Sequence, residues 1–294
     1  MRFGNGYAVW GFEGNNWSCD YLKMADMNAD CGFDCFEISA SNLHDMTDEF
    51  IAEFKKKAED RGLYLSVNDG PAADRDFASP DEAVRKNALK WYQELMENMV
   101  KIGSHDLIGA IYSTWPSDFT YLDKDAAWEH SIAGLKELSK TAEKLGIVIS
   151  LEVLNRNESY ILNDCKEAKE YIKRIGSPNV KILLDTYHMN IEEDNMYDAI
   201  RLAGSDLGHF HVGECNRKLP GEGNSINWAE IGKALRDIHY DGCVVMEPFE
   251  IPGGEVGRSI RVWRDLTGGD RSEATMTAKV KKSLQFLKKN LLAE

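Results

Sequence analysis

Four apolar segments in the second half of the sequence each end in a side chain that can bind a metal ion. Short apolar runs of this kind are typical of strands that are buried on both faces. A carboxylate at the end of such a strand is costly unless it binds a partner. The sequence therefore predicts that neighbouring strands bring four polar groups to the same edge of a sheet. The segments are Ile147–Leu151 before Glu152, Lys181–Leu184 before Asp185, Leu207–Phe210 before His211, and Cys243–Met246 before Glu247.

Strand and helix patterns alternate along the chain from beginning to end. This alternation predicts parallel pairing, and eight strand–helix units in 294 residues match the size of a (β/α)8 TIM barrel. We expect a single α/β domain over residues 1–294, since no low-complexity linker divides the chain. A doubly wound open sheet is the alternative, because strand order is not visible in a sequence. The four earlier strands are expected at Arg2–Trp10, Asp34–Ile38, Leu63–Val67 and Leu107–Tyr112.

Apolar stripes at helical spacing predict the helices between these strands. Ser79, Pro80 and Glu82 mark one helix start with a cap, a first-turn proline and a capping box. Asn68–Pro71 predicts a turn after the third strand. The expected helices are Asp20–Ala29, Thr47–Asp60, Pro80–Ile102, Trp128–Leu145, Asp164–Ile175, Ile191–Ala203, Trp228–Ile238 and Lys279–Leu292.

The balance of charged residues argues against several classes of partner. The chain has 49 acidic and 35 basic residues, which gives a formal net charge of −14. An acidic surface repels phosphate backbones and anionic membranes, so neither nucleic acid nor a membrane is an expected partner. The segment Met1–Trp10 has no long apolar stretch of a signal peptide, and no run approaches the roughly 20 apolar residues of a membrane helix. We therefore expect a cytoplasmic protein.

The six cysteines are scattered, and none forms a CxxC pair. Scattered cysteines in a large domain without a signal peptide are most simply reduced thiols. A zinc site built on cysteine is not expected, because the usual spacing of its ligands is missing. The cysteines are Cys19, Cys31, Cys35, Cys165, Cys215 and Cys243.

The expected barrel places its active site at the C-terminal ends of the strands. Glu152, Asp185, His211 and Glu247 all fall at that end. Three carboxylates and one imidazole favour Mn²⁺, Mg²⁺ or Co²⁺ over metals that prefer thiolates. The alternative is that individual carboxylates pair with lysine or arginine at the barrel rim.

Further polar side chains follow these strand ends on loops. Glu158, His188, Glu214 and Arg217 are candidates for substrate contact, although each could also be an ordinary loop residue. Arg217 offers a fork of donors that suits hydroxyl or carbonyl oxygens. Glu37 is expected to support the ligands, and His209 is expected to be a core histidine one layer below His211. Trp10, Trp17 and Trp115 could form an apolar wall for a sugar or could simply pack in the core. The loops Asn216–Asn227 and Phe249–Gly269 are expected to cover the mouth of the barrel.

Six stretches carry a resemblance to a known family: Tyr112–Pro116, Glu152–Arg156, Leu184–Glu193, Gly213–Arg217, Met246–Phe249 and Val262–Asp265. They resemble the ketose 3-epimerases, the family of D-tagatose 3-epimerase and D-allulose (D-psicose) 3-epimerase within the xylose-isomerase-like barrels. The resemblance covers nearly the whole chain and is strongest after residue 107. It implies a divalent metal, Mn²⁺ first with Co²⁺ or Mg²⁺ as alternatives, and a homodimer or homotetramer. The implied metal ligands are Glu152, Asp185, His211 and Glu247, and the implied substrate contacts are Glu158, His188, Arg217, Trp115 and Tyr7.

The implied reaction is epimerisation at C3 of free ketohexoses of the D-fructose/D-allulose and D-tagatose/D-sorbose type. The C3–H bond is weakly acidic only because C2 is a carbonyl, and inversion needs an acid–base group on each face. Glu152 and Glu247 are interpreted as these groups, acting through an enediolate. Competing interpretations are an aldose–ketose isomerase of the same superfamily, a DNA-repair endonuclease and a sugar-binding protein without activity. The acidic charge argues against the endonuclease, and the pair of glutamates argues against binding alone.

The chain departs from the family pattern on its early strands. Gly6 stands where relatives carry an aromatic or other large residue, and Asn68 and Asp69 lie in a third-strand loop that also differs. The fourth strand is also one residue shorter before Tyr112. All three sites lie on strands one to four, which should face C4 to C6 of the sugar. We therefore expect a preference at C4 to C6 that is looser than, or different from, that of the relatives.

Overall fold

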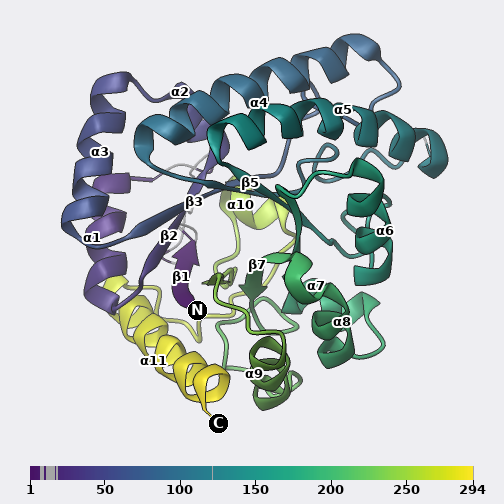
Figure 1. The fold of residues 1–294 in the computed structure, drawn as a ribbon. Helices are drawn as coiled ribbons and strands as arrows, with labels where there is room; N and C mark the ends of the chain where they lie inside the picture. Colours follow the sequence, from purple (N-terminus) through teal and green to yellow (C-terminus); the bar gives the residue numbers. More distant parts are fainter. Residues whose placement is uncertain (7–9, 11–16, 18, 121, 294) are drawn as a thin grey trace.

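Eight parallel strands pair in chain order and close into a barrel, with β1 hydrogen-bonded to both β2 and β8 (Figure 1). The computed structural model describes residues 1–6, 10, 17, 19–120 and 122–293. The closed barrel confirms the expected (β/α)8 architecture and excludes the open sheet. The strands are β1 (Arg2–Gly6), β2 (Cys35–Ser39), β3 (Tyr64–Asp69), β4 (Asp106–Gly109), β5 (Val148–Glu152), β6 (Val180–Asp185), β7 (Leu207–Val212) and β8 (Cys243–Met246).

The helices surround the barrel on its outer side, except α10, which lies over the opening of the barrel (Figure 1). They are α1 (Tyr21–Cys31), α2 (Ala40–Asp45), α3 (Asp48–Asp60), α4 (Glu82–Ile102), α5 (Lys124–Leu145), α6 (Cys165–Ile175), α7 (Thr186–Glu192), α8 (Met196–Ala203), α9 (Trp228–Asp237), α10 (Gly254–Ser259) and α11 (Glu273–Leu292). The C-terminal helix α11 packs against α9 and α1, which joins the last part of the chain to the first. Within the described ranges, none of the helices combines the length and apolar character needed to cross a membrane.

Polar caps decide where the helices begin. The expected start of α4 at Pro80 is wrong, because the helix begins at Glu82 and the Asp81 side chain accepts a hydrogen bond from the Ala83 N–H at 2.8 Å. Ser79 instead accepts a hydrogen bond from the Asp81 N–H at 3.1 Å, ahead of the helix. Aspartate and serine cap helices about equally well. Asp81, which comes later in the chain than Ser79, caps this helix and sets its first residue.

Two other helix expectations are also corrected. The segment expected as one helix over Ile191–Ala203 forms α7 and α8, because Asn195 caps the second helix by accepting a hydrogen bond from the Asp198 N–H at 3.0 Å. The helix expected from Lys279 begins at Glu273. The short helices α2 and α10 lie in segments where no helix was expected, and α7 begins at Thr186, so His188 lies on a helix and not on the expected loop.

The strand ends near the third and fourth strands differ from the expectation as well. β3 continues through Asp69, so Asn68 and Asp69 belong to the strand and not to a turn. β4 ends at Gly109, which has a φ of +114°. A Cβ atom at Gly109 would lie 2.2 Å from the Asp69 carbonyl oxygen, so this close approach of two backbones requires glycine. β1 ends at Gly6, and most of the remainder of its expected range falls outside the described residues.

The interior of the barrel contains small and polar side chains. Alternate residues of each strand point inward, and Cys35, Ser66 and His209 are buried there. Gly4 makes room for them, since a Cβ atom at that position would lie 2.9 Å from the Cys35 Cβ and 2.8 Å from the Val245 Cγ2. The large apolar core packs between the sheet and the helices, which leaves the barrel axis free for polar chemistry.

Candidate active site

The four predicted ligands meet at the C-terminal mouth of the barrel. Glu152 and Asp185 end β5 and β6, His211 lies near the end of β7, and Glu247 directly follows β8. One ligand atom from each residue lies within 4.8 Å of the other three. His211 Nδ1 is 3.7 Å from Glu152 Oε1 and 3.9 Å from Glu247 Oε1. These four residues are called the mouth group below.

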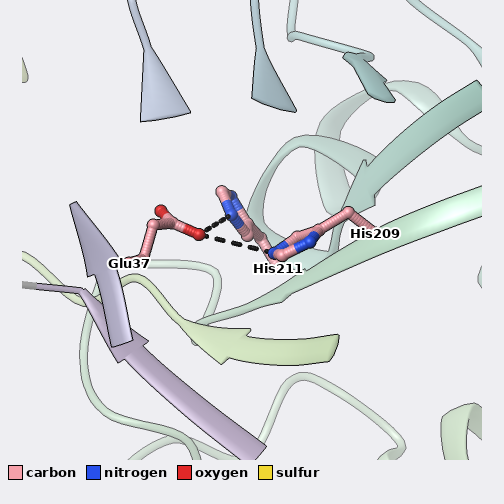
Figure 2. A group of neighbouring side chains, drawn as sticks. All are labelled: Glu37, His209 and His211. Atoms are coloured by element: carbon pink, nitrogen blue, oxygen red, sulfur yellow. Dashed lines mark hydrogen bonds and ion pairs between the residues drawn. The ribbon is translucent and has the colours of Figure 1, made fainter. Parts of the chain in front are cut away.

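The His211 ring is oriented as a metal ligand would be. Its Nε2 lies 3.1 Å from Glu37 Oε2 (Figure 2), so Nε2–H donates to Glu37 and Nδ1 faces the carboxylates of the mouth group. Nδ1 is buried and has no hydrogen-bond partner among the described residues. The carboxylates beside Nδ1 are stabilised by a cation, which is a proton on Nδ1 in the metal-free protein and a metal ion in its place when metal is bound. The residues therefore fit a divalent metal ion with oxygen and nitrogen ligands and a carboxylate behind the histidine.

The electrostatics of the mouth group have the sign expected for a cation site. Burial by itself would lower the pKa of His211, but the charge of Glu37 and of the carboxylates beside it raises that pKa well above its usual value. Burial raises the pKa of Glu247 to about 8. The negative charges of Glu152 and Asp185 also raise this pKa, whereas the positive charges of His211 and Arg217 lower it. The His211 shift indicates that negative charge surrounds its ring, whereas the Glu247 shift mainly reflects burial.

Arg217 is the arginine at the mouth group. Its Nη1 donates to Glu247 Oε2 at 2.9 Å and to Asp185 Oδ2 at 3.2 Å. The guanidinium lies 3.7 Å above the ring of Tyr187. Arg217 has a φ of +64°, an uncommon conformation for arginine, and the Phe249 N–H donates to its carbonyl oxygen at 2.8 Å. A strained backbone conformation that is held in place by neighbours is often found at functional sites.

His188 and Glu158 are held by a residue that the sequence analysis did not identify. Asn155 donates from its backbone N–H to His188 Nδ1 at 3.1 Å and from its side chain to Glu158 Oε1 at 3.0 Å. Because Nδ1 accepts, the neutral ring carries its proton on Nε2, which lies 3.6 Å from Glu152 Oε1. Trp115 Nε1 donates to the second Glu158 oxygen at 2.9 Å. Asn155 stands in the motif that follows β5, but an asparagine after a strand is equally typical of a turn.

The early strands carry a second feature that was not predicted, an ion pair between the buried Asp69 and the half-buried Arg75. Arg75 donates to Asp69 Oδ1 and Oδ2 at 3.2 and 3.3 Å, and to Ser41 Oγ at 2.7 Å. The Tyr92 hydroxyl donates to Asp69 Oδ2 at 2.6 Å, and the guanidinium stacks 4.2 Å from the Trp91 ring. No periodicity marks this pair, because one partner ends β3 and the other lies on the loop that follows it.

A cavity of about 470 Å³ is lined by Glu152 and Glu247 of the mouth group, by His188 and Arg217, and by the ion pair of Asp69 and Arg75. Trp17 and Trp115 also line it, with ring centroids 6.1 Å apart in an edge-to-face arrangement. Gly70 admits the Trp115 ring, since a Cβ atom there would lie 2.9 Å from Trp115 Cε3. Trp10 has a different environment, because its Nε1 donates to Thr277 Oγ1 on α11 at 2.9 Å.

Two loops border the mouth. The segment Phe249–Gly269 includes α10, which brings Glu255 to the cavity wall as expected for a cover. Glu214 has a structural environment: its buried carboxylate accepts hydrogen bonds from the Gly221 N–H at 2.7 Å and from Trp228 Nε1 at 3.0 Å. Glu214 therefore orders the loop after β7, which carries Arg217.

The fold and the mouth group together define a (β/α)8-barrel enzyme with a site that fits a divalent metal ion, beside a cavity large enough for a small polar substrate. Residues 26–266 match the family model described as xylose isomerase-like TIM barrel. The chain is 47% identical over 270 residues to the D-psicose 3-epimerase of Ruminiclostridium cellulolyticum, covering 92% of this chain and 91% of that protein.

Two solved structures are similar over their whole length. A D-psicose 3-epimerase in the presence of D-fructose has a TM-score of 0.96 at 40% identity and covers 100% of both chains. A D-psicose 3-epimerase with D-tagatose, from Clostridium cellulolyticum H10, has a TM-score of 0.96 at 45% identity and covers 99% of both. The chain belongs to the ketose 3-epimerase family of the xylose isomerase-like TIM barrels, and it is an isomerase.

Proposed function

We propose that this chain catalyses metal-dependent epimerisation at C3 of free ketohexoses of the D-fructose/D-allulose and D-tagatose/D-sorbose type. The observation that carries the proposal is the pair Glu152 and Glu247, which come from β5 and β8 and both lie beside His211 Nδ1. The relatives support the substrate class, because their structures are those of D-psicose 3-epimerases with D-fructose and with D-tagatose.

Inversion at C3 requires that a proton leave from one face of the sugar and that a proton return to the other. The C2 carbonyl makes the C3–H bond acidic, and loss of the proton gives an enediolate. Glu152 removes the proton on one face, and Glu247 supplies a proton on the opposite face. Their roles exchange when the reaction runs in reverse.

The metal would be held by the mouth group, and Mn²⁺, Co²⁺ or Mg²⁺ suits its oxygen-rich ligands. When bound, the ion supplies positive charge that stabilises the negative oxygens of the enediolate. His188 donates from Nε2–H to the O1 and O2 end of the sugar, and Arg217 donates to the same end. Glu158, fixed by Trp115, accepts from a hydroxyl there and sets the orientation of the substrate.

The early strands would contact C4 to C6 and set the sugar preference. A Cβ atom at Gly6 would meet the Met246 carbonyl oxygen at 3.8 Å, an ordinary contact distance, and Gly6 itself lines the cavity. Asp69 and Arg75 add polar groups to the same cavity. These features support a preference at C4 to C6 that is looser than, or different from, that of the relatives. Tyr7, a further expected substrate contact, lies outside the described residues.

Incubation with D-fructose and Mn²⁺, followed by chromatography, tests the reaction directly. The proposal expects D-allulose as the product and, in heavy water, deuterium at C3 of that product. An aldose as the product, with deuterium at C1 or C2, would assign the chain to the aldose–ketose isomerases instead. Absence of any product in the presence of bound metal would contradict both assignments.

We also propose that the chain assembles into a homodimer or homotetramer. Trp263, within the motif Val262–Asp265, is 72% exposed. Large aromatic side chains are enriched at protein interfaces and unusual at this exposure on an isolated surface. The position of Trp263 after α10 would place an interface near the loop that borders the mouth.

A further inference from the structure

A second group of metal-capable side chains lies inside the barrel, nearer the N-terminal ends of the strands. Asp106 begins β4, Cys243 begins β8 and His209 lies within β7. One ligand atom of each lies within 4.8 Å of the other two. His209 and Cys243 are buried and Asp106 is half-buried, so this inner group (Asp106, His209 and Cys243) is largely closed from solvent.

His209 lacks the hydrogen bonds that a buried imidazole needs. Its ring is fully buried, and within the described part of the chain neither ring nitrogen has a hydrogen-bond partner. Nε2 lies 3.4 Å from Glu37 Oε2, on the side of the mouth (Figure 2). Nδ1 is therefore the ring atom left for Asp106 and Cys243. Burying such a nitrogen without a partner is costly, and a cation between the three side chains would satisfy it.

A second thiol adjoins the inner group. Cys35 packs with Cys243 and Val245 in one buried cluster, and its sulfur lies 3.7 Å from Ser66 Oγ. All six cysteines fall within the described ranges, and all are free thiols. One thiol, one imidazole and one carboxylate therefore lie together in the barrel interior, and the Cys35 thiol adjoins them on the Cys243 side.

These ligands differ in kind from those at the mouth. Carboxylates dominate the mouth group and favour hard ions, whereas thiolates with an imidazole favour Zn²⁺, which takes four ligands tetrahedrally in closed structural sites. Zinc–sulfur and zinc–nitrogen bonds of about 2.3 and 2.0 Å place the ligand atoms about 3.5 Å apart, so the side chains of the inner group would have to approach by roughly 1 Å. Arg2 pairs with Cys243 in the register of β1 and β8, and its charge would offset that of two thiolates and a carboxylate around Zn²⁺.

We propose that Asp106, His209 and Cys243, with Cys35 as the fourth ligand, form a structural zinc site inside the barrel. Each thiol loses its proton to solvent as its sulfur binds the ion. The ligands come from β4, β7, β8 and β2, so the bound ion links strands from both halves of the chain. This site is separate from the mouth group and is independent of the proposed reaction.

Titration of the metal-stripped, full-length protein with Co²⁺ distinguishes the two sites, because only a thiolate ligand gives sulfur-to-cobalt charge-transfer absorption. We expect Co²⁺ to bind the wild type at two sites, one of which develops this band, and Zn²⁺ to remove the band by displacement. Cys243→Ser leaves Cys35 as the remaining thiolate ligand and should weaken the band, and the double variant Cys35→Ser/Cys243→Ser should abolish it. Cys31→Ser, a control cysteine on α1, should retain it, and so should Asp185→Asn, which disrupts only the mouth group.

A second measurement on the wild type keeps the test decisive if Cys243→Ser does not fold. Bound Zn²⁺ should slow alkylation of two cysteines, which peptide mass analysis should identify as Cys35 and Cys243. Wild-type protein without a sulfur-to-cobalt band at saturating Co²⁺ would overturn the proposal. The same conclusion follows if the band is unchanged in Cys243→Ser, if it survives in the double variant, or if Zn²⁺ leaves the alkylation rates of both cysteines unchanged.

Discussion

Replacement of Glu37 by glutamine tests whether the mouth group depends on the carboxylate behind it. Glu37 is buried, and its Oε2 lies 3.1 Å from His211 Nε2 and 3.4 Å from His209 Nε2. Its other oxygen accepts a hydrogen bond from Asn68 Nδ2 at 2.8 Å. Glutamine keeps the size of the side chain and removes its charge, so Glu37→Gln isolates the electrostatic contribution.

The expected effect follows from these contacts. A hydrogen bond to a charged group contributes about 1.5–3 kcal/mol. Loss of a carboxylate that orients a histidine ligand lowers metal affinity about 10–100-fold, which corresponds to about 1.4–2.7 kcal/mol. The two ranges overlap, so we expect Glu37→Gln to weaken Mn²⁺ binding by about 10–100-fold.

Acid denaturation of the metal-free protein gives a second readout of the same change. Burial by itself would raise the pKa of Glu37, but the charge of His211 and the contacts with both histidines outweigh it and lower the pKa below its ordinary value of 4.5. A carboxyl group whose pKa is lower in the folded state than in the unfolded state stabilises the folded state at pH values above the unfolded-state pKa. This stabilisation is lost as the pH falls towards and through the folded-state pKa. Glu37→Gln lacks this group, so its free energy of unfolding should fall less steeply than that of the wild type below pH 4.5.

Isothermal titration calorimetry with Mn²⁺ measures the affinity. Glu193→Gln is the matched control, because that carboxylate accepts a hydrogen bond from the Cys165 N–H at 2.7 Å, away from the mouth group. The control should bind Mn²⁺ as the wild type does. Equal affinities of all three proteins would refute the role of Glu37 in holding His211.

Four further changes test the proposed function. Chelation of the metal should abolish turnover and lower the melting temperature, and Mn²⁺ or Co²⁺ should restore both; full turnover in protein shown to be metal-free would contradict the metal site. Glu152→Gln and Glu247→Gln should each lower kcat by about 10²–10⁴-fold with an unchanged circular dichroism spectrum; a near-normal kcat would remove that residue from the mechanism. Gly6→Tyr should change the relative kcat/KM for D-fructose, D-allulose, D-tagatose and D-sorbose by about 1–3 kcal/mol; constant ratios would show that Gly6 does not shape the cavity. Trp263→Ser should reduce the mass measured by light scattering; an unchanged mass would place the interface elsewhere.

The barrel could be predicted because its signal is repeated along the chain. Each strand–helix unit carries the same alternation, so an error at one boundary does not alter the topology. Individual boundaries depend instead on which of several polar residues captures a free backbone N–H group. Ser79 and Asp81 both had the chemistry to cap α4, and only the folded backbone decides between them. Asn195 divides a segment whose apolar periodicity is continuous.

The mouth group could be predicted for a related reason. Its four residues follow apolar runs, and parallel strands necessarily bring their C-terminal ends together. Asn155 and Arg75 could not be predicted in this way, because their partners are fixed by the path of loops. Asn155 contacts His188 across two strand ends, and Arg75 folds back onto Asp69.

The inner group could not be predicted, because in a closed barrel the spacing of residues in the sequence does not reveal which ligands meet. Zinc sites are usually recognised from ligands a few residues apart, held on one turn or one helix. In a closed barrel the register of pairing decides which side chains meet: Cys35 pairs with Gly4 on one side of β1, and Cys243 pairs with Arg2 on the other. The two thiols come from opposite ends of the sequence, yet only the glycine-containing strand β1 lies between them. Because Gly4 has no side chain to separate them, the closing strand creates a contact that no local pattern in the sequence could indicate.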